Sequence, residues 1–228
     1  MSSTALVPTL VRPSNRSVAL VADAVLVALG VTVIALSAQV SIPLPSTPVP
    51  LTGQTFGVLL VGASYGAVRA FATMALYLVV GGIGYGVFAG HSSGWDVLKF
   101  SSATGGYLVG MLVAAALVGV LAERGWDRKV PWALVTMVLG NVVIYAFGFA
   151  WLQHAFGLTA SQTWHAGVRP FLPCDAIKIA LAAGLLPAAK RHRRTASTSF
   201  HAAGSRPAAR AILIASPGRN GRTPACQV

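Results

Sequence analysis

Charged residues are scarce in this chain of 228 residues, and acidic residues are the scarcest. Charged side chains make up 10% of the sequence, and 5 Asp and Glu residues stand against 17 Lys and Arg, while 55% of the residues are hydrophobic. A water-soluble domain carries roughly 25% charged residues because its surface faces water. The composition therefore argues against a soluble domain and indicates a domain embedded in a lipid bilayer.

Cysteine is almost absent as well. Cys174 and Cys226 provide no disulfide framework and none of the spacings typical of zinc sites, so we expect neither a metal nor a cofactor. The sequence also lacks the phosphate-binding motif G-x-x-x-x-G-K-[ST]. We therefore predict that the chain is not an enzyme, and that any ATP-driven step needs other subunits.

The net charge of +12 raises the question of a nucleic-acid partner. The basic residues lie between the apolar runs and in the C-terminal tail, without the interleaved aromatic residues on which bases stack. We therefore expect no nucleic-acid partner.

Apolar runs alternate with polar, glycine-rich or proline-rich segments. About 20 apolar residues cross a bilayer as a helix, and the runs predict six helices, of which the second and third are short. These helices are expected at residues 18–40, 54–65, 70–80, 104–122, 131–152 and 173–189. The expected fold is thus an all-α integral membrane protein with about six transmembrane helices.

The same runs divide the chain. Residues 1–17 form an N-terminal segment, residues 18–190 the six-helix domain, and residues 191–228 a basic tail whose composition predicts disorder.

Lysine and arginine predict the orientation, because they concentrate on the cytoplasmic side of membrane proteins. With six helices, both termini lie on one side of the membrane. That side carries these basic residues: Arg12, Arg16, Arg69, Arg124, Arg128, Lys129 and the cluster 190–194. The opposite side carries Lys99 and Arg169 in its loops. We therefore expect a multi-pass protein of the plasma membrane with both termini in the cytoplasm.

Two charged residues open the last predicted helix. Asp175 and Lys178 are three residues apart, which places them on one helix face. One interpretation is an ion pair at a helix start near the membrane surface. The other is a polar clamp with one acceptor and one donor, suited to a neutral ligand such as a cyclic urea.

Two loops have distinctive compositions. Residues 41–52 contain four prolines, which forbid a helix and predict an ordered loop outside the membrane. Residues 90–94 read G-H-S-S-G, which matches the G-x-S-x-G pattern of serine hydrolases at Ser92. No strand is predicted before this motif, so we interpret the match as chance. A glycine-rich loop also offers backbone amides to a carboxylate.

Four segments together resemble one family. They are A-Q-V-S-I-P-L-P-S-T-P-V-P-L-T-G-Q-T-F at 38–56, V-F-A-G-H-S-S-G at 87–94, T-G-G-Y-L-V-G at 104–110 and R-P-F-L-P-C-D-A-I-K at 169–178. In this order they resemble the BioY family, the biotin-specific substrate-binding (S) components of energy-coupling factor (ECF) transporters. The resemblance runs from about the first helix to Lys190.

The resemblance implies an outward-facing biotin site, with residues 41–52 as its gate. Asp175 and Lys178 would bind the ureido ring of biotin. The resemblance also suggests these further binding residues: Gln54 in the wall, Gly90 in the glycine-rich loop, Tyr145 beside that loop and Lys99 near the biotin carboxylate. The family more often has glycine at the positions of His91 and Cys174 and a side chain at that of Gly86, which bears mainly on the carboxylate end.

The implied function is high-affinity capture and uptake of biotin, together with a transmembrane coupling subunit and two ATPase subunits. Small residues on the first helix either pack within the chain or, as the resemblance implies, dock the coupling subunit. They are Ala24, Ala28, Thr32, Ala35 and Ala38. An S component for another small vitamin and an intramembrane serine hydrolase using Ser92 remain as alternatives.

Overall fold

A computed structural model describes residues 16–45, 47–99 and 101–187. Its α-helices are α1 (Arg16–Gln39), α2 (Gln54–Tyr65), α3 (Ala67–Gly82), α4 (Gly105–Glu123), α5 (Val130–Phe156), α6 (Ala160–Gly167) and a last helix, Leu172–Pro187. Short helical turns occupy Ala89–His91, Trp95–Leu98 and Trp126–Arg128. The predicted helical fold is confirmed, with a helix at each of the six expected places. The predicted tail and residues 1–15 of the predicted N-terminal segment lie outside the described residues.

Local sequence explains where these helices begin and end. Gly66, with a φ of 84°, separates α2 from α3, because this left-handed backbone suits glycine. The first amide of α3, at Ala67, donates to Glu123 Oε1 at 3.0 Å. A proline lies in the first turn of α5, where its missing amide hydrogen costs no helical bond.

The segment 154–169, expected as a loop, is partly helical. Helix α5 continues to Phe156 and ends at Gly157, which has a φ of 62°. Helix α6 follows after Thr159, whose side chain accepts from the Gln162 amide while the Gln162 side chain accepts from Thr159 N. This reciprocal cap is what the spacing T-x-x-Q provides, and it is the local reason that the segment is helical.

The proline-rich loop is a small hairpin. Strands β1 (Ser41–Ile42) and β2 (Leu51–Thr52) pair antiparallel, with Ser41 opposite Thr52. The prolines lie between these two strands, where a missing amide breaks no ladder bond. The predicted ordered loop is thus held as a β-hairpin that leads from α1 into α2.

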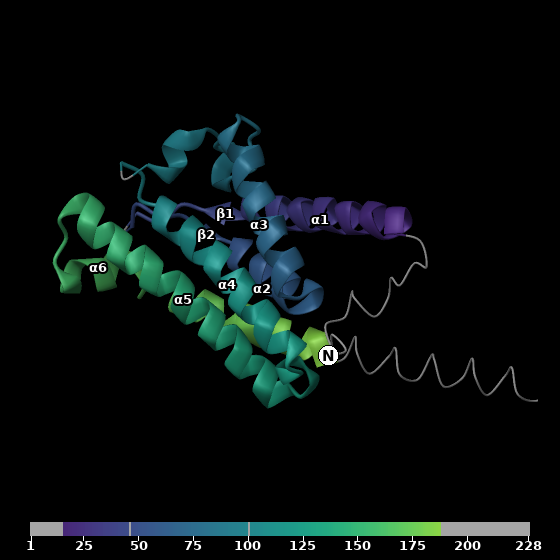
Figure 1. The fold of residues 1–228 in the computed structure, drawn as a ribbon. Coiled ribbons are helices and arrows are strands. Elements are labelled where there is room, and N and C mark those ends of the chain that lie inside the picture. The colour runs from purple at the N-terminus through teal and green to yellow at the C-terminus, as the bar shows by residue number, and fades with distance from the viewer. Residues whose placement is uncertain (1–15, 46, 100, 188–228) are drawn as a thin grey trace, which may run out of the picture. The chain divides into compact units, whose positions relative to one another are not determined.

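Helix α4 is central and α1 is peripheral. Helix α4 packs against α5, α2 and α3, while α1 contacts α3 and α2 (Figure 1). In their most apolar windows, 67% of α4 is buried but only 17% of α1. The buried residues of α1 lie in its second half, at Gly30, Ile34 and Ala38.

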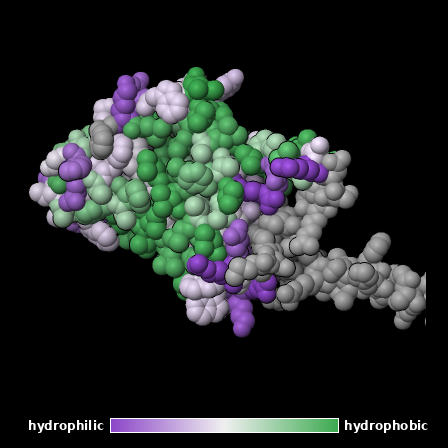
Figure 2. All heavy atoms as spheres, in the orientation of Figure 1, coloured by the Kyte–Doolittle hydropathy of each residue, from purple (hydrophilic) through white to green (hydrophobic). Residues whose placement is uncertain are grey.

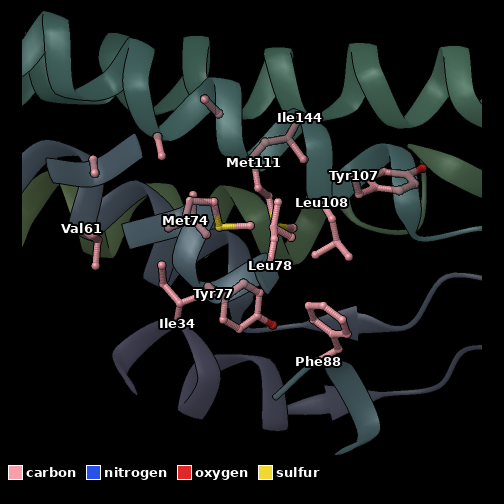
Figure 3. Packing of buried hydrophobic residues seen from close by; sticks show 14 of the residues in the cluster. Ile34, Val61, Met74, Tyr77, Leu78, Phe88, Tyr107, Leu108, Met111 and Ile144 are labelled. Carbon is pink, nitrogen blue, oxygen red and sulfur yellow. The ribbon is translucent and has the colours of Figure 1, made fainter. Parts of the chain in front are cut away.

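The core follows from these contacts. Its main cluster joins Met74 of α3 and Met111 of α4 with aromatic residues, and Figure 3 shows Tyr77 and Phe88 side by side in it. Their rings meet edge to face at 5.4 Å between centroids, a favoured aromatic geometry. A side chain at Gly81 would overlap the Phe88 ring, so this glycine permits the contact.

The outer surface is apolar. Hydrophobic residues cover the middle of the face seen in Figure 2, and hydrophilic ones gather toward its edges. Helices α1, α4 and α5 are each long and apolar enough to cross a membrane, and α6 with the last helix, bent by 54°, forms a fourth candidate. Helices α2 and α3 are shorter. With large exposed hydrophobics such as Val21, Leu36 and Leu181, this surface is that of a multi-pass membrane protein.

Candidate ligand-binding site

A cavity of about 210 Å³ lies among the hairpin, the segment 88–97, α4, α5 and the last helix. Its apolar wall is formed by Val49, Pro50, Phe88, Ala89, Val97, Leu108, Met111, Ile144 and Phe171. Its polar and aromatic-polar lining residues are Thr52, Gln54, Thr55, Ser92, Thr104, Tyr107, Tyr145, Asp175 and Lys178. The cavity thus combines apolar walls with a few converging polar groups, as small-molecule sites do.

The ion pair of Asp175 and Lys178 lies in the wall of this cavity. Lys178 Nζ donates to Asp175 Oδ1 at 2.7 Å, and the Asp175 side chain is only 5% exposed. The first two turns of the last helix position both, because residues three apart share a helix face. Asp175 is therefore buried at the cavity and Lys178 is half-buried beside it, so this is not a solvent-exposed pair at a helix start.

Four donors surround the Asp175 carboxylate. Besides Lys178, Thr55 Oγ1 donates to Oδ1 at 3.3 Å. Tyr145 OH and Asn141 Nδ2 of α5 donate to Oδ2 at 2.6 and 3.3 Å. A buried carboxylate stays ionised only when such charge-assisted bonds offset its lost hydration. The arrangement therefore gives both oxygens of this buried carboxylate hydrogen-bond partners in the cavity wall.

Lys178 uses all three of its donors. In addition to Asp175, Nζ donates to the Thr52 carbonyl at 2.6 Å and to Thr55 Oγ1 at 3.3 Å. Lysine thereby ties the last helix to β2 and α2. A ligand oxygen that binds Lys178 must take the place of one of these partners, and Thr55 makes the longest contact.

Asn141 contributes a further polar atom next to this cluster. Its side chain is buried in α5, one turn before Tyr145. Its amide nitrogen binds Asp175, whereas its carbonyl oxygen is buried without a partner among the described residues. The neighbourhood of Asp175 thus contains one unused acceptor.

Gln54 and the loop around Gly90 meet through Tyr77. Gln54 Nε2 donates to Tyr77 OH at 3.1 Å, and Tyr77 OH donates to the Val87 carbonyl at 2.9 Å. Gln54 lines the cavity, as do Ala89 and Ser92 on either side of Gly90. Gly90 itself is not among the lining residues; it supplies a backbone turn, with a φ of 64°.

Lys99 is placed apart from the other predicted site residues. It forms an ion pair with Asp96, and both side chains are largely exposed, at 65% and 82%. Neither residue lines the cavity. The structure thus brings Asp175, Lys178, Gln54 and Tyr145 together and leaves Lys99 outside.

Tyr107 is a lining residue that sequence reasoning did not select. Its hydroxyl donates to the Gly167 carbonyl at 2.7 Å and so joins α4 to the end of α6. Side chains at Gly148 or Gly167 would collide with Tyr107. Gly105 and Gly106 of T-G-G-Y, where an added side chain would collide with Trp151, indicate close packing of α4 on α5 but do not point to Tyr107 itself.

Ser92 does not have the surroundings of a catalytic serine. Its hydroxyl donates to the Ala89 carbonyl at 2.8 Å, and no strand leads into G-H-S-S-G within the described chain. A hydrolase elbow needs that strand and a histidine that activates the hydroxyl. No three His, Cys, Asp or Glu side chains in residues 16–187 that the structure describes group into a metal site.

A multi-pass helical protein that encloses a small apolar cavity with a buried ion pair belongs to the class of membrane proteins that bind a small substrate. Residues 9–195 match the sequence model of the BioY family, and the chain belongs to that family. The resemblance inferred from the four motifs is thereby confirmed.

Relatives extend over most of the chain. The biotin transporter BioY of Rhizobium etli is 36% identical over 169 residues, which cover 71% of this chain and 89% of the relative. The biotin transporter BioY of Thermotoga maritima is 35% identical over 150 residues, covering 66% and 85%. The probable biotin transporter BioY of Pyrococcus horikoshii is 36% identical over 157 residues, covering 69% and 89%.

A solved structure shares the fold. The crystal structure of the S-component for biotin from an ECF-type ABC transporter superposes with a TM-score of 0.66 and 20% identity. The match covers 79% of this chain and 95% of that one. The helical arrangement described above is therefore that of an S component.

Proposed function

We propose that this chain captures biotin with high affinity and carries it across the cytoplasmic membrane as the substrate-binding subunit of an ECF-type transporter. Membership of the BioY family and relatives named as biotin transporters support this proposal. The relatives are transporters and not enzymes, and the fold is that of an S component. The single observation that carries the chemistry is the buried Asp175–Lys178 pair in the cavity wall.

The polar end of the cavity suits the ureido ring of biotin. A cyclic urea donates through two N–H groups and accepts through one carbonyl oxygen. Asp175 offers a charged acceptor, and Lys178 offers a charged donor if the urea oxygen replaces Thr55 at Nζ. Tyr145 orients the carboxylate through its 2.6 Å bond. We assign the ureido ring to this end.

The apolar walls suit the rest of the ligand. Met111, Ile144, Phe171 and Phe88 present hydrocarbon and aromatic surface to the sulfur-containing ring and its chain. The chain would then extend toward the turn that contains Gly90, whose neighbours Ala89 and Ser92 line the cavity. Gln54 completes the wall near Tyr77.

We propose that the cavity faces outward and that both termini lie in the cytoplasm. The cavity is built from the start of α4, the second half of α5 and the start of the last helix. Arg124, Arg128 and Lys129 lie in the connection between the opposite ends of α4 and α5. Because basic residues concentrate on the cytoplasmic side, the cavity belongs to the other side.

The proposed partners are a transmembrane coupling subunit and two ATPase subunits. The chain's lack of a phosphate-binding motif supports the need for ATPases. Among the small residues of α1, Ala24, Ala28 and Thr32 are exposed and support a docking role for this helix, most of which is not buried by the rest of the chain. Ala35 and Ala38 pack inside the chain instead.

Uptake tests the proposal against the main alternative, an S component for another vitamin. Biotin-requiring cells without biotin uptake of their own would express this chain together with an ECF coupling module, and labelled biotin would be counted inside them. We expect accumulation that excess unlabelled biotin abolishes and excess thiamine or riboflavin does not. Equal competition by one of the other vitamins would favour the alternative, and absence of accumulation would contradict the proposal.

A further inference from the structure

The segment Val87–Ser92 forms a tight turn beside the cavity. Gly90 has φ and ψ of 64° and 32°, and His91 has a φ of 59°. The Ser92 amide donates to the Ala89 carbonyl at 3.4 Å, and the Phe88 amide donates to the Ser92 carbonyl at 3.1 Å. Two successive left-handed residues, Gly90 and His91, closed by the bond from Ser92 to Ala89, define a type I′ turn. Such a turn favours glycine or asparagine at both positions. His91 is therefore strained, and the turn depends on outside support.

The side chain of Gln39, the last residue of α1, provides that support. Its Oε1 accepts from the His91 amide at 3.2 Å. Its Nε2 lies within 3.2 Å of both the Val87 and the Phe88 carbonyl oxygens and donates to them. One amide side chain therefore holds both arms of the turn, although 52 residues separate it from His91.

A second fastening comes from α3. Tyr77 OH donates to the Val87 carbonyl, and the Phe88 ring packs on the Tyr77 ring with only 2% of Phe88 exposed. The turn is thus held from two helices. Loss of the Gln39 contacts would loosen the turn while Tyr77 still keeps it near its place.

The turn also faces the ligand site, because Phe88, Ala89 and Ser92 line the cavity. We propose that Gln39 is a positioning residue that holds the Val87–Ser92 turn closed against the cavity and so limits how fast the ligand enters and leaves. This inference rests on the proposed function. Gln39 itself does not line the cavity, so it acts on the ligand through the turn.

The test compares Gln39→Leu with Ser37→Ala in the purified full chain. The leucine side chain would keep nearly the volume of the glutamine side chain and lose every bond to the turn. Ser37 is a matched control on α1, because among the described residues its hydroxyl bonds only within the helix, to the Ile34 carbonyl. Hydrogen–deuterium exchange of peptides spanning residues 86–94 reports on the turn without any ligand. The association and dissociation rates of biotin, with the binding stoichiometry, report on how the Val87–Ser92 turn limits entry and exit of the ligand.

For Gln39→Leu we expect faster exchange in the turn, dissociation of biotin about tenfold faster, and an unchanged stoichiometry, while Ser37→Ala matches the wild type. Unchanged exchange would show that Gln39 does not hold the turn. Faster exchange with wild-type rates, or a lower stoichiometry with wild-type rates, would overturn the gating role. If Gln39→Leu does not fold, Gln39→Met, which also loses every bond to the turn, must shift exchange and dissociation in the same directions. A wild type that binds no biotin would refute the proposed function. The exchange measurement would still show whether Gln39 holds the turn.

Discussion

Replacing Asp175 by asparagine removes the negative charge that four donors now surround. The substitution keeps the shape of the side chain but converts the short bonds from Lys178 and Tyr145, at 2.7 and 2.6 Å, into weaker contacts or clashes between donors. It also leaves Lys178, whose side chain is 19% exposed, without its counter-ion. The perturbation therefore acts on the polar end of the cavity and on the stability of the fold.

The expected loss of binding free energy for biotin is that of one charged hydrogen bond. Such a bond contributes about 1.5–3 kcal/mol, which corresponds to a dissociation constant for biotin about 10- to 150-fold higher. The fold is expected to lose roughly 3 kcal/mol, because removing one partner of a buried pair strands the other. Calorimetric titration of the detergent-purified variant gives the first quantity, and its thermal unfolding gives the direction of the second.

The matched control is Asp23→Asn. Asp23 pairs with Arg69 at 2.7 Å between α1 and α3, is 42% exposed and does not line the cavity. We expect its biotin affinity to stay within about twofold of the wild type, because partly exposed pairs contribute little. An Asp175→Asn variant with wild-type affinity would refute the assignment of the ureido ring to this pair.

Three further outcomes are expected. Tyr145→Phe removes the 2.6 Å bond to Asp175 and should raise the dissociation constant for biotin about tenfold in the same titration, whereas an unchanged value would exclude Tyr145 from orienting the carboxylate. Lys99→Ala should leave that constant within about twofold, because Lys99 pairs with exposed Asp96 outside the cavity; a larger rise would restore its role at the biotin carboxylate. His91→Gly should stabilise the fold by about 0.5–1 kcal/mol and raise its unfolding temperature, since glycine accepts the positive φ, and a lower temperature would argue against strain at this residue.

The helices were largely predictable because their signals are local. Apolar runs indicated their positions, and prolines and charges indicated the interruptions. The two departures also have local causes. The reciprocal cap of Thr159 and Gln162 starts α6 within the segment 154–169, which was expected as a loop. The four prolines of residues 41–52 are compatible with a short hairpin as well as with irregular chain.

The site was predictable only in part. Asp175 and Lys178 stood out because charges are rare in membrane segments. Thr55 did not, because it reaches Asp175 across 120 residues of sequence and carries no charge. Lys99 was expected near the biotin carboxylate, but it pairs locally with its neighbour Asp96.

The hold of Gln39 on the turn was equally hidden. The sequence shows a glutamine beside a proline-rich loop and a histidine within a glycine-rich loop. Only the folded chain shows that the amide of the first meets the backbone of the second. Long-range bonds from side chain to backbone leave no periodicity that a sequence could display.

Direct binding of biotin by the chain alone tests the central claim most sharply. The full chain would be purified in detergent without coupling or ATPase subunits and titrated with biotin in a calorimeter. The account predicts saturable binding of one biotin per chain with a submicromolar dissociation constant, weakened by Asp175→Asn and not by Asp23→Asn. Absence of saturable binding by folded wild-type protein, or equal binding by the Asp175→Asn variant, would contradict it.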